Sequence, residues 1–295
     1  MNFINFKENS ARRQIADFPL SKRASLIVGS ILGSILRKRQ AVIEKEPFAN
    51  DANILNRLIR NGLYAKAFKQ EDHVKLRNFF SHYWGKEAAA FHEGWNDRFE
   101  RMFLKHDVSV IHDLEKLISE RKADEPFRHL YEIGCGGGQV LTYLHDRFGN
   151  FTSLTGIDLG EEQIANNRKA STTQRTAFEA ADANKWIPEN AKSNSVILTN
   201  GGVFEYFLQS ELEALFSFAA ANLGPVAICL VETIATDHDL DKEPDSLVYG
   251  REMAFSHNYP QLLKAAGFSI VTCTERAGFS EDGGGRWIRV LAIKE

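Results

Sequence analysis

The chain is poor in cysteine and has no excess of basic residues. Its three cysteines, Cys135, Cys229 and Cys273, lie far apart among 295 residues, and no two have the spacing of a paired motif. This pattern fits a reduced, cytoplasmic protein better than a zinc framework or a disulfide scaffold, so we expect no metal site. The formal net charge of -3 argues against a general nucleic-acid binder, because such proteins carry a basic surface. We therefore expect a small-molecule substrate.

An apolar run long enough to serve as an integral membrane segment is also missing. The stretch Leu26–Leu36 is too short to span a bilayer, and no small-residue cleavage site of a signal peptide follows it. Basic residues flank it at 22–23 and 37–39, so the helix predicted here could lie on an anionic membrane surface. Because serines and glycines interrupt its apolar face, we favour packing on the main domain instead.

The sequence feature that best predicts a ligand-binding site is a glycine-rich loop between a predicted strand and a predicted helix. The apolar run 129–133 ends in four glycines within five positions, and residues 139–144 then continue at helical spacing. Glycines let backbone N–H groups and a helix terminus approach a ligand closely. Asp158 ends the next predicted strand, where a carboxylate can accept both hydroxyls of a ribose. The pattern indicates a site for a nucleotide-like ligand.

The chain divides near residue 120. Before this point turn signals are few and apolar residues recur at helical spacing, so residues 1–120 are predicted to form a helical cap or lid. Residues 122–126 end in a proline and form a predicted linker. Residues 121–295 are predicted to be a Rossmann-like catalytic domain, because strands and helices alternate there.

The second part predicts an α/β fold with a doubly wound, seven-stranded, mostly parallel sheet. Predicted strands lie near 129–133, 153–157, 176–180, 195–199, 225–231, 268–274 and 287–293, and predicted helices near 138–147, 161–170, 209–222 and 257–266. Only residues 277–286 separate the last two strands, which is too short for a crossover helix. The last strand is therefore expected to be antiparallel.

This order of elements and four motifs resemble the class I S-adenosylmethionine-dependent methyltransferases over residues 125–295. The resemblance is carried by Glu132-x-Gly134-Cys135-Gly136-x-Gly138, Gly156-Ile157-Asp158-Leu159-x-Glu161-x-Gln163-Ile164, Ala181-Asp182-Ala183, and Val196-Ile197-Leu198-Thr199-Asn200-Gly201-Gly202.

The resemblance implies S-adenosyl-L-methionine as the cofactor and a role for most motif residues. Asp158 would bind the ribose diol, Leu159 would face adenine, and Asp182 would accept from the adenine amino group beside Ala183. The amino-acid end of the cofactor would lie near Asn200 and Gly201, with Glu132 beneath its amino group. The cofactor-binding residues implied are Glu132, Gly134, Cys135, Gly136, Gly138, Asp158, Leu159, Gln163, Asp182, Ala183, Asn200 and Gly201.

A nicotinamide or flavin site is the alternative for this loop. That fingerprint has G-x-G-x-x-G spacing, whereas its last position here holds Gln139 or Leu141. The strand-four motif and the terminal hairpin also do not belong to dinucleotide sites, so we favour the methyltransferase-type site.

Several residues are candidates for the reacting centre. Aromatic rings attract a sulfonium, which makes Tyr83, Trp84, Phe204 and Tyr206 candidates for a substrate-pocket wall. Asn200, Tyr206, His238 and His257 are the candidate catalytic groups, the two histidines as general bases. Arg286 could hold a substrate carboxylate. Core packing is the competing explanation for Tyr83 and Trp84, a structural or capping role for each histidine, and a solvent-facing hairpin position for Arg286.

Three functions fit this sequence. The first is methyl transfer to an oxygen or nitrogen of a small metabolite, as the resemblance implies for most proteins with these motifs. The second resembles the azetidine-2-carboxylate synthases, in which the aminobutyrate chain of the cofactor closes on itself and methylthioadenosine is released. The third is a binding protein that keeps the cofactor site without catalysis.

Overall fold

The computed structural model describes residues 20–48, 53–94, 97–121, 126–171, 173–250, 253–277 and 286–295, with no side chains described for 87–94. Residues 122–125 of the predicted linker and the hairpin glycines at 283–285 lie outside these ranges. The chain divides into two compact units. The first comprises Met1–Lys86 with Val248–Ala254, and the second comprises Glu87–Leu247 with Phe255–Glu295.

The first unit is built from helices. Its elements are α2 (Leu20–Ile35), α3 (Arg37–Lys45), α4 (Ile54–Lys69) and the first part of α5 (His73–Gly94). Asn53 caps α4, because its side-chain oxygen accepts from the backbone N–H groups of Leu55 and Asn56. A small core gathers Ile43, Ile59, Leu63 and Phe79 from α3, α4 and α5.

The helices α2 and α4 pack with their backbones almost in contact. A Cβ atom on Gly62 would lie 2.3 Å from the carbonyl carbon of Gly29, and one on Gly29 would lie 1.8 Å from the carbonyl oxygen of Leu58. Only glycine fits on both sides of such a crossing. The glycines that interrupt the apolar pattern of α2 are therefore its contact with α4, and α4 is the packing partner of this helix.

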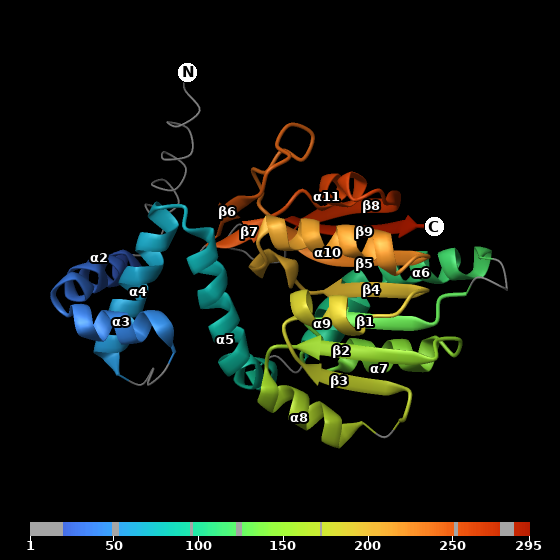
Figure 1. Cartoon of the computed structure of the whole chain (residues 1–295), viewed down its shortest axis with the longest axis horizontal. Helices are drawn as coiled ribbons and strands as arrows, with labels where there is room; N and C mark the ends of the chain where they lie inside the picture. Colours follow the sequence, from blue (N-terminus) through green and yellow to red (C-terminus); the bar gives the residue numbers. More distant parts are fainter. Residues whose placement is uncertain are drawn as a thin grey trace. The chain divides into compact units, whose positions relative to one another are not determined.

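The second unit carries a seven-stranded sheet in the order β3-β2-β1-β4-β5-β9-β8 (Figure 1). Its elements in chain order are η1 (Phe99–Asp107), α6 (Ser109–Glu120), β1 (His129–Ile133), α7 (Gln139–Arg147), β2 (Ser153–Asp158), α8 (Glu161–Ala170), β3 (Thr176–Ala180), α9 (Ala183–Asn190), β4 (Ser195–Asn200), η2 (Phe204–Tyr206), α10 (Gln209–Asn222), β5 (Val226–Ile234), α11 (Tyr259–Ala265), β8 (Ser269–Ala277) and β9 (Arg286–Lys294). A short two-stranded sheet pairs β6 (Leu247–Tyr249) with β7 (Ala254–Ser256).

The predicted doubly wound α/β sheet is confirmed. The pairs among β1 to β5 are parallel, whereas β9 is antiparallel to both of its neighbours, β5 and β8. In Figure 1 the arrow of β9 points opposite to those of β2 and β3. Apolar residues cover both faces: α9, α10 and α11 contribute to one core, and η1, α6, α7 and α8 to the other. All parallel strands therefore end at one edge, where ligands of such sheets bind.

The boundary between the units differs from the predicted one near residue 120. The helix α6 packs on β5 and β9, and its residues Val110, Ile111 and Leu114 are buried in the core beneath the sheet. Because this apolar face needs the sheet to cover it, residues 97–120 belong with the sheet unit rather than with a separate cap.

The segment η1 is a π-helix anchored to the last hairpin. Asp107, at its end, is buried and accepts from Nε of Arg276 at 3.0 Å and from Nη2 at 2.8 and 2.9 Å. The guanidinium of Arg276 also stacks over Trp287 at 4.8 Å. A π-helix inside a helical region often marks a functional position; here Arg98 precedes its first turn.

Candidate functional site

The glycine loop turns sharply between β1 and α7. Gly134, Gly136 and Gly138 have φ values of 70°, 46° and 72°, and the Gly138 N–H donates to the Cys135 carbonyl at 2.8 Å. Positive φ at these positions requires glycine. A Cβ atom on Gly134 would also lie 2.5 Å from the Val203 side chain, so the loop after β4 packs directly on it. The loop presents its backbone at the carboxyl edge of the sheet.

Asp158 ends β2 beside this loop. One carboxylate oxygen accepts from the Gly136 N–H at 3.0 Å and the other from the Gly160 N–H at 2.9 Å. The carboxylate therefore shapes the loop and the start of α8. Asn167 of α8 supports the same loop, since its amide donates to the Gly136 carbonyl at 2.6 Å.

Several buried oxygen atoms at the same edge have no hydrogen-bond partner among the described residues, and two of them belong to the predicted cofactor-binding residues. These two are Oε2 of Glu132, near the end of β1, and Oδ1 of Asn200, at the end of the adjacent strand β4. Burial, followed by the charge of Asp158, raises the pKa of Glu132 well above its usual range. Buried acceptors in folded proteins nearly always have a partner. These two oxygens therefore indicate a donor that is supplied by a ligand.

A guanidinium lies beside them. Nη2 of Arg98 donates to the Gly201 carbonyl at 2.6 Å, and Gly201 directly follows Asn200. Gly201 and Gly202 have φ values of 93° and 78°, which turn the chain away from the strand end. The edge of β4 thus combines a cation with unsatisfied acceptors.

Glu232 holds the loop after β4 in place. It lies within β5, fully buried, and one of its carboxylate oxygens accepts from the backbone N–H groups of Val203 and Phe204 at 2.9 and 3.0 Å. Burial raises its pKa to about 8. Glu205 supports the loop from the other side, because it accepts from the Thr233 hydroxyl at 2.8 Å.

The residues predicted to face the adenine of the cofactor lie at the carboxyl ends of β2 and β3. Asp182 caps α9 and accepts from the Asn184 N–H at 3.0 Å, and Ala183 beside it is buried. Leu159 is half-buried. Gln163 donates to the side chain of Asn167 at 2.8 Å, so it acts on the glycine loop through that residue.

Phe204 is not available as a pocket wall. Its side chain is fully buried, and its ring packs against those of Phe207 and Phe216 at centroid distances of 5.1 and 5.8 Å. This corrects its predicted role as a substrate contact. Tyr206, half-buried in η2, remains at the strand edge as predicted.

Neither candidate histidine offers a nitrogen to a substrate. His238 is buried with Nδ1 on the Ser256 hydroxyl and Nε2 on the Glu243 carbonyl, at 2.8 and 3.1 Å. His257 is fully buried with Nδ1 on the Ser246 hydroxyl and Nε2 on the Phe204 carbonyl, at 2.5 and 3.0 Å. Their predicted role as general bases is therefore replaced by a structural one, since each ring joins two loops.

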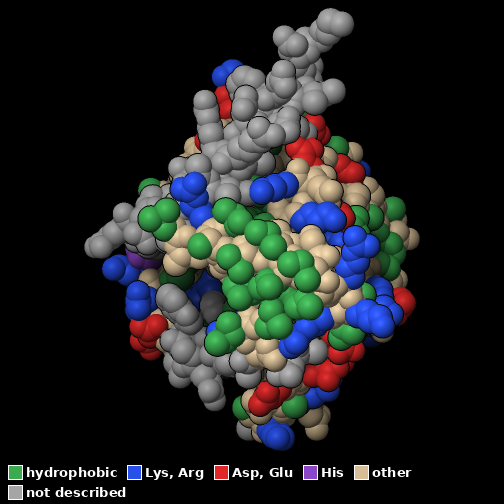
Figure 2. Space-filling model, turned by 90° about the vertical axis from the view of Figure 1, so that its left-hand side faces the viewer, with side chains coloured by type: hydrophobic (Ala, Val, Ile, Leu, Met, Phe, Trp, Pro, Cys, Tyr) green, Lys and Arg blue, Asp and Glu red, His purple; other side chains and the backbone are tan. Residues whose placement is uncertain are grey.

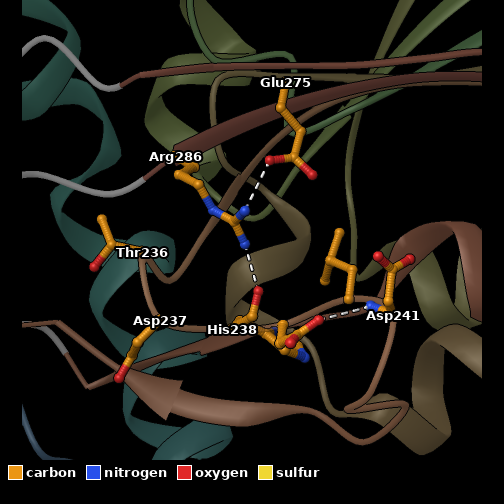
Figure 3. Close-up of a pocket in the computed structure, with 8 residues that line it drawn as sticks. Thr236, Asp237, His238, Asp241, Glu275 and Arg286 are labelled. Atoms are coloured by element: carbon orange, nitrogen blue, oxygen red, sulfur yellow. Dashed lines mark hydrogen bonds and ion pairs between the residues drawn. The ribbon is translucent and has the colours of Figure 1, made fainter.

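Arg286 is engaged within the protein. Its guanidinium donates to Glu275 at 2.9 Å and to the His238 carbonyl, as Figure 3 shows. The carboxylate that we expected it to hold on a substrate is thus supplied by Glu275. A pocket of about 340 Å³ lies around this pair, beyond the end of β5; its lining is Thr236, Asp237, His238, Asp239, Leu240, Asp241, Glu275 and Arg286. Its carboxylates outnumber its one guanidinium, so it offers no unneutralised cation to an anionic ligand.

Tyr83 and Trp84 lie on α5 in the helical unit. The Tyr83 ring contacts those of Phe48 and Trp84 at centroid distances of 5.5 and 5.1 Å, and more than a third of Tyr83 is exposed. These contacts account for both rings as packing residues, and their role toward a substrate stays a prediction.

Sequence reasoning missed or misplaced three residues of the site: Arg98, Asn167 and Glu232. Glu232 carried a signal, because a single acid interrupts an apolar run, but the predicted strand ends near residue 231 whereas β5 continues to Ile234. Asn167 and Arg98 carried none, since each acts through a backbone carbonyl distant in sequence.

No described group of histidine, cysteine and acidic side chains has the arrangement of a metal site. Cys135, Cys229 and Cys273 are unpaired. Within the described ranges, no helix is both long and apolar enough to cross a membrane.

The comparisons with known proteins point to one family. Residues 130–225 match the model of the methyltransferase domain. No curated protein sequence matches the chain.

Similar solved structures include a S-adenosylmethionine-dependent methyltransferase from Leishmania major, with 11% identity over 74% of this chain and 82% of that one and a TM-score of 0.49. Magnesium protoporphyrin IX methyltransferase from Synechocystis, with bound S-adenosylhomocysteine, has 16% identity over 75% and 100% of the two chains and a TM-score of 0.45. The [4+2]-cyclase SpnF has 17% identity over 61% and 80%, with a TM-score of 0.45.

The fold assignment rests on the strand order, the antiparallel β9 and the family match rather than on these distant similarities. Residues 130–225 match the methyltransferase domain, and the sheet unit around them has the fold of the class I S-adenosylmethionine-dependent methyltransferases.

Proposed function

We propose that the protein transfers the methyl group of S-adenosylmethionine to an oxygen or nitrogen of a small molecule. The observation that carries the proposal is the edge of β1 and β4, where two buried acceptors and a guanidinium lie together. An amino acid has one ammonium group and one carboxylate, which match this set. A dinucleotide has neither an ammonium group nor a carboxylate to offer at this position.

Each group of the edge has a role in holding the cofactor. Oε2 of Glu132 and Oδ1 of Asn200 would accept from its ammonium group, and Arg98 would pair with its carboxylate. Asp158 would accept from the ribose hydroxyls, and Asp182 with Ala183 and Leu159 would face adenine. The bound cofactor supplies an activated methyl group on a sulfonium.

The demands on the protein are then alignment of the acceptor and exclusion of water. Glu232 and Glu205 fix the loop after β4, and Tyr206 lies on that loop with an aromatic face that favours a cation. The described site contains no histidine with an available ring nitrogen. We therefore propose that the acceptor reacts without a histidine base, through positioning alone.

The proposed acceptor is a small molecule because the chain has a net charge of -3, unlike proteins that bind nucleic acids broadly. Three unpaired cysteines support the further proposal that the protein acts in the cytoplasm.

One observation favours a second candidate, the cyclisation of S-adenosylmethionine to azetidine-2-carboxylate. The raised pKa of Glu132 brings this carboxylate closer in basicity to an amine. Oε2 of Glu132 could then take the proton that the amine must lose before it can act as a nucleophile.

Analysis of the nucleoside product separates these functions. The purified protein is incubated with S-adenosylmethionine alone and with a panel of amine and hydroxyl acceptors. We expect S-adenosylhomocysteine to form only when an acceptor is present. Methylthioadenosine and a cyclic amino acid without any acceptor would establish the second function, and tight binding with neither product would leave a non-catalytic binding protein.

A further inference from the structure

The helix α2 of the first unit exposes a continuous aliphatic stripe. Leu20, Ile27, Val28, Ile31 and Ile35 retain 80, 59, 43, 56 and 70% of their surface. Their spacing of three, four and seven residues places them on one face of the helix. Figure 2 shows hydrophobic side chains gathered on this side of the molecule, with Lys and Arg side chains next to them.

The opposite face of α2 is fixed. Leu26, Gly29 and Gly33 are its buried residues, and the close crossing of Gly29 with Gly62 holds them on α4. Asn61 also donates to the Ser25 hydroxyl at 2.8 Å, and Ser30 to the Gly62 carbonyl at 3.4 Å. A helix held in this way cannot rotate to bury its aliphatic stripe.

The charge around the stripe has one sign. Residues 18–43 contain five basic and no acidic residues, although the whole chain has a net charge of -3. Arg23, Arg37 and Lys38 are exposed, whereas Arg39 donates to Asn56 at 2.7 Å. A surface that combines aliphatic side chains with cations is complementary to a layer that is apolar inside and anionic outside.

We propose that α2 lies on the surface of a membrane containing anionic lipids, with the aliphatic stripe among the acyl chains and with Arg23, Arg37 and Lys38 against lipid phosphates. The helix has 16 residues, which corresponds to about 24 Å and is shorter than the hydrocarbon core of a bilayer. It therefore lies in the plane of the interface. This assignment does not depend on the methyl acceptor.

Two features favour lipid over a protein partner. Residues 20–45 contain no aromatic residue, whereas the strongest contacts of protein interfaces are enriched in tryptophan and tyrosine. A second copy of the chain that bound through the same face would place arginine and lysine of one copy near those of the other, because a twofold interface is self-complementary. Like charges brought together in this way oppose association.

Vesicle sedimentation of the full chain tests the proposal. The vesicles contain phosphatidylcholine alone, or phosphatidylcholine with one quarter phosphatidylserine. We expect wild type to sediment with the second kind only, and the double variant Ile27→Asp/Ile31→Asp to remain in the supernatant. The matched control is Val74→Asp/Val271→Asp, which changes the net charge equally at exposed aliphatic residues outside α2 and α3; it should sediment as wild type does.

A second variant tests the charge. Arg37→Gln/Lys38→Gln should weaken binding to the anionic vesicles by roughly fivefold for each charge removed and should reduce its dependence on salt. Circular dichroism and affinity for S-adenosylhomocysteine, measured for every variant, separate lost binding from lost folding. Equal sedimentation of wild type and Ile27→Asp/Ile31→Asp would overturn the proposal. So would light scattering that shows a dimer which these aspartates dissolve, together with no vesicle binding by wild type.

Discussion

The two units leave different kinds of group unsatisfied. In the sheet unit apolar side chains are covered on both faces, and what lacks a partner is polar: the buried oxygens of Glu132 and Asn200 at one sheet edge. In the helical unit the stripe on α2 leaves aliphatic side chains in contact with water. Unsatisfied buried acceptors indicate a small polar ligand, whereas an uncovered aliphatic stripe indicates an extended apolar surface.

Glycine also serves the two units differently. Gly134 and Gly138 adopt positive φ, so their role is conformational freedom in the loop between β1 and α7. Gly29 and Gly62 are helical, and their role is the absence of a side chain where two backbones meet. The first pair sets the conformation of a loop, and the second pair allows two helices of the first unit to pack closely.

The largest expected effect concerns the buried acid of the sheet unit. The pKa of Glu232 is about 8 in the folded protein and is near 4.5 when exposed. An acid with a raised pKa contributes stability that is present below pH 4.5 and is lost as pH rises to about 8. The loss follows a slope of about 1.4 kcal/mol per pH unit, on the order of several kcal/mol in total.

Denaturant unfolding of wild type and Glu232→Gln across this range measures the effect. Glutamine keeps an oxygen for the Val203 and Phe204 N–H groups but does not ionise, so the variant should lose less stability between pH 5 and pH 8. Parallel pH profiles for the two proteins would show that Glu232 is ionised throughout.

The second effect tests the crossing of α2 and α4. Gly62→Ala places a methyl group 2.3 Å from the Gly29 backbone, so the helices must separate, at a cost of about 3 kcal/mol. Hydrogen exchange should accelerate in α2 and α4. Gly137→Ala is the matched control, because its added Cβ meets nothing within 4 Å. Equal acceleration throughout the sheet would show instead that the two units unfold as one.

The third effect concerns the ribose. Asp158→Ala should weaken binding of S-adenosylmethionine by about 2 kcal/mol, because charged hydrogen bonds to the ligand are lost. Calorimetry measures this affinity. Asp182→Ala is the comparison at the adenine end. An unchanged affinity for Asp158→Ala would count against the assigned orientation of the cofactor.

The smallest effect distinguishes the two ends of the cofactor. Arg98→Ala should lower the affinity for S-adenosylhomocysteine by about tenfold, which is about 1.4 kcal/mol. It should leave the affinity for methylthioadenosine unchanged, because that nucleoside lacks the carboxylate. Asp158→Ala should weaken the binding of both ligands. Equal losses for both ligands in Arg98→Ala would assign Arg98 a role in the shape of the loop alone.

The sequence predicted the sheet well because its signals are local. The strands β4 and β5 are built on apolar runs, and the strand-loop-helix pattern around Gly134 follows from glycines that take positive φ. The short helix α9 was missed, since its eight residues include Pro188 and give little periodicity. The predicted boundary near residue 120 differs from the division into compact units, because α6 has the pattern of an amphipathic helix whether it packs on a cap or on a sheet.

The sequence predicted the site residues that belong to a recognisable motif. It did not predict which side chains are buried or engaged by packing in the folded chain. His238 and His257 are polar residues in loops by sequence, yet each is buried with both ring nitrogens on neighbouring groups. Arg286 is neutralised by Glu275, which lies eleven positions earlier across the hairpin. Such pairings depend on the register of β8 and β9, which residue types do not encode.

The π-helix η1 connects two distant parts of the sheet unit. Arg98 at one end touches the Gly201 carbonyl, and Asp107 at the other is clamped by Arg276 of β8. If Arg98 holds the carboxylate of the cofactor as proposed, a change at Arg276 is expected to weaken that contact through η1. The terminal hairpin thus anchors one end of the π-helix whose other end contacts the loop after β4.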